Sequence, residues 1–69
     1  MDIHHLARMA NQISDFFESA MEHEAAVTST ATHLRNFWEP RMRREIVAYA
    51  KSDGAELSAV ARAAVLSLD

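Results

Sequence analysis

The sequence predicts an all-α fold, a small bundle of three to four helices built around a helical hairpin. Apolar residues recur at spacings of three and four along most of the 69-residue chain, which is the periodicity of a buried helix face. No segment alternates apolar and polar residues as a half-buried strand does. The single Pro and the single Gly fall between the periodic segments, where helices should end. We therefore expect one helical domain, residues 1–69.

The first helix is predicted over residues 3–21. Its apolar stripe consists of Ile3, Leu6, Ala10, Ile13, Phe17 and Ala20. Asp2 is expected to cap this helix, because an Asp side chain accepts hydrogen bonds from the free N–H groups of the first turn. Met9 and Phe16 widen the stripe, which suits a helix that contacts two neighbours.

The second helix is predicted over residues 24–38. Its apolar positions are Val27, Ala31, Leu34 and Trp38, and Phe37 broadens the lower end. The hydroxyl side chains of residues 28–30 and 32 lower its helix propensity, because β-branching and competing hydrogen bonds disfavour a helix interior. Tertiary contacts are therefore expected to hold this helix.

The third helix is predicted over residues 40–51, with Met42, Ile46, Tyr49 and Ala50 on its apolar face. Pro40 suits the first position of a helix, and Glu39 before it is biased toward extended backbone. The helix should end near Lys51, because Gly54 follows in a turn and is free to adopt positive φ.

The fourth helix is predicted over residues 59–68, with Ser58 as its cap. Two thin apolar sides fit the spacing equally well. They are Val60, Ala64 and Leu68, or Ala61, Val65 and Leu68. Because it is rich in Ala and lies near the chain end, we expect it to be the least firmly held element.

Composition narrows the class of protein. So short a chain buries only about 60% of its unfolded surface, and without Cys it has no disulfide to compensate, so a partner is the expected stabiliser. The N-terminus lacks the pattern of a signal or transit peptide, and no apolar run is long enough to span a membrane, which favours a cytoplasmic chain without membrane contact. Residues 1–24 are acidic and residues 33–51 are basic, and we expect the two segments to attract each other within the hairpin.

The segment HLRNFWEPRMRR, residues 33–44, sets the only Trp and the only Pro beside four of the seven basic residues. Aromatic anchors beside arginines are typical of docking surfaces. Arg41, Arg43 and Arg44 fall in the first turns of the third helix, where the partial positive charge of the helix end disfavours cations. Carboxylates or anions from another surface would relieve that repulsion.

Two segments, RMANQISDFF at residues 8–17 and HLRNFWEPRMRR at residues 33–44, resemble the small delta subunit of NAD-dependent, molybdenum-containing formate dehydrogenases. The resemblance covers about two-thirds of the chain. It implies a non-catalytic accessory subunit of a cytoplasmic complex, whose partner is the large catalytic subunit. That partner is expected to carry bis-molybdopterin guanine dinucleotide, and this chain is expected to help it acquire or hold the cofactor while binding none itself.

The predicted partner interface combines the aromatic anchors, the arginines and the polar pair Asn11 and Gln12. If a partner covers the first helix, both amides must be hydrogen-bonded, and such amides fix orientation. The whole set is Arg8, Asn11, Gln12, Phe16, Phe17, Arg35, Phe37, Trp38, Pro40, Arg41, Arg43 and Arg44. No metal site is predicted, because none of the four His residues has a His or Glu at helical ligand spacing. Catalytic motifs are also lacking, so we expect no catalytic residue.

Two other functions stay open at this point. The basic segment could bind single-stranded nucleic acid, with Phe37 and Trp38 stacking on bases, although the net charge of −3 argues against a nucleic-acid-binding domain. A self-sufficient helical homodimer would also supply the missing stabilisation. Identifying the proteins that co-purify with the chain would separate the three readings.

Overall fold

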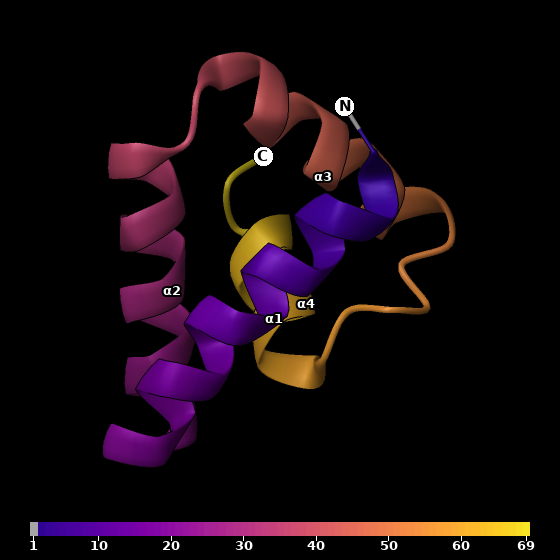
Figure 1. Ribbon diagram of the computed structural model, residues 1–69. Coiled ribbons are helices and arrows are strands. Elements are labelled where there is room, and N and C mark those ends of the chain that lie inside the picture. Colours follow the sequence, from indigo (N-terminus) through magenta and orange to yellow (C-terminus); the bar gives the residue numbers. More distant parts are fainter. Residues whose placement is uncertain (1) are drawn as a thin grey trace.

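The computed structural model describes residues 2–69 and forms four α-helices (Figure 1). They are α1 (Ile3–Ala20), α2 (His23–Phe37), α3 (Pro40–Ser52) and α4 (Ala59–Leu66). No strand occurs in residues 2–69, so the prediction of an all-α bundle is confirmed. None of these helices combines the length and the apolar character of a membrane-spanning segment.

The helix ends follow the signals in the sequence. The Asp2 side chain accepts a hydrogen bond from the backbone N–H of His4 at 3.0 Å, and the Ser58 hydroxyl accepts one from Ala61 at 3.2 Å. Pro40 opens α3, and Gly54 has a φ of 61° in the turn after it. Each predicted helix is therefore present, and none of its ends is displaced by more than two residues.

The α1–α2 hairpin turns through Met21 and Glu22 alone. Both residues are extended, with ψ near 165° and 169°, and the Met21 N–H donates to the Phe17 carbonyl oxygen at 2.9 Å. Neither position needs positive φ, so the turn forms without Gly or Pro. In Figure 1 the two helices are close at this turn and diverge from it, and α4 lies in the angle between them.

α4 packs one face against each of the other three helices, while Ala59 and Leu66 on its other face are exposed. Val60, Ala61, Ala64 and Val65 are all buried. Residues from both of the predicted apolar sides are therefore buried in the same structure. The expectation that α4 is the least firmly held element is wrong, because its small side chains let three helices approach it closely.

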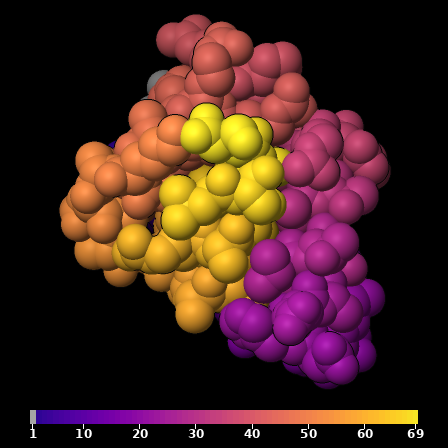
Figure 2. All heavy atoms as spheres, turned by 180° about the vertical axis from the view of Figure 1, so that it is seen from behind, coloured from indigo at the N-terminus to yellow at the C-terminus, as the bar shows by residue number. Residues whose placement is uncertain are grey.

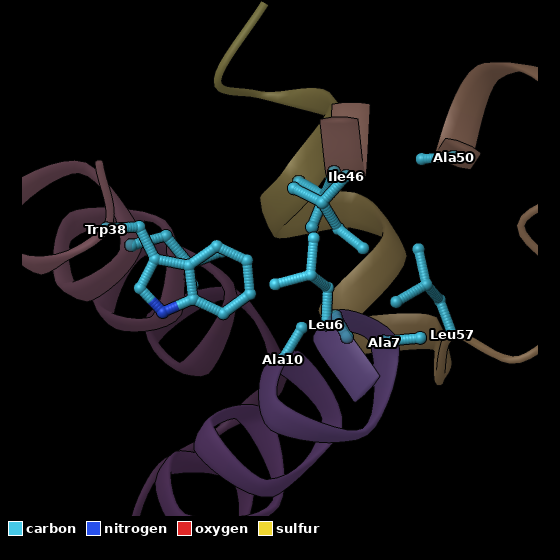
Figure 3. Close-up of a cluster of buried hydrophobic side chains, with 10 residues drawn as sticks. Leu6, Ala7, Ala10, Trp38, Ile46, Ala50 and Leu57 are labelled. Atoms are coloured by element: carbon cyan, nitrogen blue, oxygen red, sulfur yellow. The ribbon is translucent and has the colours of Figure 1, made fainter. Parts of the chain in front are cut away.

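The largest core side chain belongs to Trp38, which ends α2 and is only 6% exposed. Figure 3 shows its indole pointing into the bundle toward Leu6 and Ile46. The buried cluster around it comprises Leu6, Ala7, Ala10, Leu34, Ile46, Ala50, Leu57, Ala61 and Val65. Trp38 is thus a core residue of this chain.

The buried faces of α1 and α2 are rotated relative to the predicted stripes. Ala7, Ser14, Ala26 and Thr30 are buried, whereas Phe16, Ala20 and Phe37 are exposed. The rotation brings small residues toward α4; at one such position the Ser14 and Ser58 hydroxyls lie 3.1 Å apart. The inclusion of Phe16, Ala20 and Phe37 in the apolar stripes is therefore corrected. Close helix packing favours small side chains where Phe16 and Phe37 were expected, and Ala20 is the last residue of α1, next to the hairpin turn.

The predicted attraction between the acidic and basic segments is not made through ion pairs. Among residues 2–69, Arg41 pairs with Glu45 and Lys51 with Asp69, and the His4 ring contacts the Glu56 carboxylate. None of the three joins residues 1–24 to residues 33–51, because the carboxylates within reach are Glu45 of α3 itself, Glu56 of the α3–α4 loop and Asp69.

Candidate docking surfaces

Two phenylalanines lie on the surface of the hairpin. Phe16 of α1 is 67% exposed and Phe37 of α2 is 73% exposed. Fully burying such a side chain stabilises by about 1.5 to 3 kcal/mol, so this chain leaves a substantial stabilisation unused. Exposed apolar groups that cluster are typical of an interaction site, whereas single ones are ordinary.

The two rings belong to a continuous aromatic row, which we define as Phe16, Phe17, His33 and Phe37. Phe16 and Phe17 are 5.3 Å apart between ring centroids, at an interplanar angle of 73°. Phe17 lies 6.4 Å from His33, and His33 lies 4.7 Å from Phe37. The row therefore crosses from α1 to α2 with edge-on and tilted ring contacts, which are the favoured aromatic geometries.

A shallow hollow lies on each side of the aromatic row. One, of about 300 Å³, is lined by Gln12, Ile13, Phe16, Phe17 and His33. The other, of about 310 Å³, is lined by Phe17, Thr28, Ser29, Thr32, His33, Asn36 and Phe37. Phe17 and His33 line both hollows, so the row forms a ridge between them. An apolar centre with hydroxyl and amide groups around it has the composition of a protein interface.

His33 is the member of this surface that the predicted interface did not include. Its neighbours come from two helices, since it contacts Phe17 of α1 and Phe37 of α2. The spacing of four between His33 and Phe37 indicates that the two share a helix face. The contact with Phe17 depends on the hairpin and has no signal in the sequence.

A second surface is the basic groove between α3 and the end of the chain. Its volume is about 370 Å³, and its lining comprises Pro40, Arg43, Arg44, Val47, Ala48, Lys51, Leu68 and Asp69. Figure 2 shows the last residues, in yellow, lying against α3. The Lys51 ammonium pairs with the Asp69 carboxylate in this groove. It shares no residue with the aromatic row.

The three arginines of α3 have different surroundings. Arg43 Nη1 donates to the carbonyl oxygens of Arg35 at 2.7 Å and Trp38 at 2.8 Å, at the C-terminal end of α2. That end carries partial negative charge, so Arg43 is stabilised within the chain. Arg41 pairs with Glu45 at 3.4 Å, while Arg44 is exposed and forms no ion pair with any of residues 2–69.

The two amides of the first motif also differ. Asn11 Nδ2 donates to the Glu56 carbonyl oxygen at 2.7 Å, and its Oδ1 accepts from the Ser58 N–H at 2.9 Å. Asn11 therefore fixes the loop before α4 onto α1. Gln12 is exposed beside Phe16, so it is the amide of the pair that a partner can reach.

The structure thus divides the predicted interface residues into separate groups. Gln12, Phe16, Phe17 and Phe37 converge at the aromatic row, and Pro40, Arg43 and Arg44 line the basic groove. Arg8 is exposed one turn before Gln12 on α1, whereas Arg35 and Arg41 are exposed outside both surfaces. Asn11 and Trp38 make contacts inside the fold. In the part of the chain that the structure describes, no three His, Asp or Glu side chains converge as a metal site requires.

A family model described as the NADH-dependent formate dehydrogenase delta subunit FdsD matches residues 5–65. The match extends over nearly all of the four helices and includes the whole aromatic row. No curated protein and no solved structure matches the chain significantly.

Proposed function

The chain belongs to the NADH-dependent formate dehydrogenase delta subunit family, and we propose that it is a non-catalytic accessory subunit that docks on the large catalytic subunit. The single observation that carries the docking proposal is the aromatic row, with Phe16 and Phe37 each about two-thirds exposed or more. We further propose that the complex is cytoplasmic.

The aromatic row has the properties of an interface anchor. Phe and other aromatic residues are enriched at interface cores, where a few buried rings supply most of the binding energy. Phe17 is partly buried and holds Phe16 and His33 at either side of it. Because the rings stand on two packed helices, the backbone that carries them is already ordered before binding, which favours affinity.

We propose that docking supports insertion or retention of the bis-molybdopterin guanine dinucleotide cofactor of the catalytic subunit. Binding shifts a conformational equilibrium only by the difference in affinity for the two states. The chain would therefore act by binding more tightly to the conformation of its partner that accepts or holds the cofactor. In this proposal the chain supplies a shaped surface, and the ligands of the cofactor belong to the partner.

Docking is tested by the double variant Phe16→Ser, Phe37→Ser, produced together with the catalytic subunit. Both positions are exposed, so thermal unfolding of the free chain should change little. Losing two anchors of about 1.4 kcal/mol or more each should weaken the affinity at least about a hundredfold and lower recovery of the complex accordingly. The matched control is Leu66→Ser, because Leu66 is 39% exposed and lies outside the aromatic row. Wild-type recovery of the double variant would refute the docking surface.

The cofactor role is tested by metal analysis of the catalytic subunit purified with the wild-type chain, with the double variant, and without the chain. We expect low molybdenum content and low formate oxidation in the last two preparations. Full molybdenum occupancy without the chain would refute the cofactor role and leave the docking result unaffected.

A further inference from the structure

We infer that the basic groove is a second docking site, and that its occupant is an acidic segment with apolar side chains from another polypeptide of the complex. The inference rests on the proposed function, since it takes the chain to be a subunit. It concerns a different surface, because the groove and the aromatic row have no residue in common.

The groove joins apolar and cationic groups along α3. Val47, Ala48 and Leu68 supply apolar surface, and Ala48 is exposed. The cations are Arg43, Arg44 and Lys51, and among the described lining residues the one acidic side chain is that of Asp69. This excess of positive charge lies on a chain whose net charge is −3, so it is a local feature that favours an acidic partner.

The chain itself shows which chemistry the groove accepts. Leu68 packs against the buried core cluster, and the next residue, Asp69, pairs its carboxylate with Lys51. An apolar side chain followed by a carboxylate therefore already occupies one end of the groove. Both partners of the ion pair are about half exposed, and such pairs stabilise little, so a carboxylate from another chain can take this position.

Arg44 provides the second charged contact. It is exposed and has no carboxylate partner among residues 2–69. Arg44 and Lys51 are seven residues apart on α3, which places them on one face at a separation of about 10 Å along the helix. The groove therefore fits a segment whose carboxylates recur at a similar distance, with an apolar residue between them over Val47 and Ala48. A guanidinium binds such a carboxylate through two parallel hydrogen bonds.

The test is photo-crosslinking in the assembled complex, with benzoyl-phenylalanine replacing Ala48 and, in a separate sample, Thr32. Thr32 is exposed beside the aromatic row and reports the contact of the proposed function. We expect the probe at position 48 to react with a polypeptide segment that mass spectrometry identifies as acidic and partly apolar. The inference would be overturned if only the probe at position 32 gave a crosslinked product. It would also be overturned if the probe at position 48 reacted with nucleic acid or with a segment that has no carboxylates.

Charge variants supply the second measurement. Combining Arg44→Glu with Lys51→Glu should lower the yield at position 48 at least about tenfold, while Arg41→Glu, on the same helix outside the groove, should leave it unchanged. Asp69→Asn removes the competing carboxylate and should raise the yield. An unchanged yield in the double variant, or a lower yield with Asp69→Asn, would overturn the inference. Unreactive probes at both positions would count against the proposed function as well.

Discussion

α4 and the aromatic row distribute apolar side chains in opposite ways. The buried face of α4 is made of small residues, with Ala61 and Ala64 fully inaccessible. The aromatic row carries three of the largest apolar groups of the hairpin and leaves Phe16 and Phe37 largely exposed. Side-chain size therefore does not decide burial in this chain. The distance between packed helices decides it. Small residues lie where two helices cross closely, and the large rings lie on the side of the hairpin that no other helix covers.

The same division separates residues of similar chemistry that are close in the sequence. Trp38 is buried beside the exposed Phe37. Asn11 is bound to the loop before α4 beside the exposed Gln12. In each pair the first residue stabilises the fold, and the second is available to a partner. Variants of such pairs test the comparison directly, since chemistry and location are nearly matched.

The largest effect is expected for Trp38→Ala. Truncating a buried Trp typically costs about 3 to 5 kcal/mol of unfolding free energy, and a chain of this size has a total of roughly 3 to 10 kcal/mol. Phe37→Ala should stay within about 0.5 kcal/mol of wild type, because its ring is 73% exposed. Denaturant unfolding of the two variants measures the difference. Equal destabilisation would contradict the division between core and surface at the end of α2.

Overpacking the buried face of α4 should have the next largest effect on stability. Ala61→Leu inserts three carbon atoms where α4 meets its neighbours, and such insertions cost about 1 to 3 kcal/mol. Ala59→Leu, at the exposed start of the same helix, is the control and should be nearly neutral. Thermal unfolding of both variants would show whether the fold requires small residues on the buried face of α4. An unchanged stability of Ala61→Leu would mean that there is space beside Ala61 that the structure does not contain.

Asn11→Ala should destabilise by about 1 to 3 kcal/mol, because it leaves the Glu56 carbonyl and the Ser58 N–H without their partner. Gln12→Ala should leave stability unchanged and, if the proposed docking surface is correct, weaken recovery of the catalytic subunit. Hydrogen exchange of the Ser58 amide gives a local readout for the first variant. Retained protection of that amide in Asn11→Ala would contradict the role of Asn11 as a clamp on the loop.

The sequence predicted the four helices because each carries local signals. Asp2 caps α1, Ser58 caps α4, Pro40 starts α3, and Gly54 lies in the turn that ends α3. Each of these signals acts only on the backbone next to it. Which face of each helix is buried depends on contacts between distant segments. For that reason the burial of Ser14 and Thr30, and the exposure of Phe37, could not be read from periodicity.

The candidate surfaces were predictable to a similar extent. Phe16, Phe17 and Phe37 were identified by residue type, but their convergence with His33 requires the hairpin. Leu68 and Asp69 join the basic groove only because the chain end folds back on α3. The repulsion predicted for Arg43 is relieved inside the chain, since carbonyl groups of α2 lie within reach of its guanidinium.

The smallest effects are expected in α3, where Arg43 and Arg41 form the third matched pair. Arg43→Ala removes a cation from the negative end of α2 and should cost about 1 kcal/mol. Arg41→Ala removes an exposed pair with Glu45, spaced at i and i+4, which is worth about 0.3 to 0.5 kcal/mol. Because salt screens exposed charges most strongly, the Arg41 effect should vanish near 1 M salt, while the hydrogen bonds of Arg43 keep part of its effect. Thermal unfolding of both variants at low and high salt measures this, and equal salt sensitivity would show that Arg43 is as solvent-exposed as Arg41 and does not cap α2.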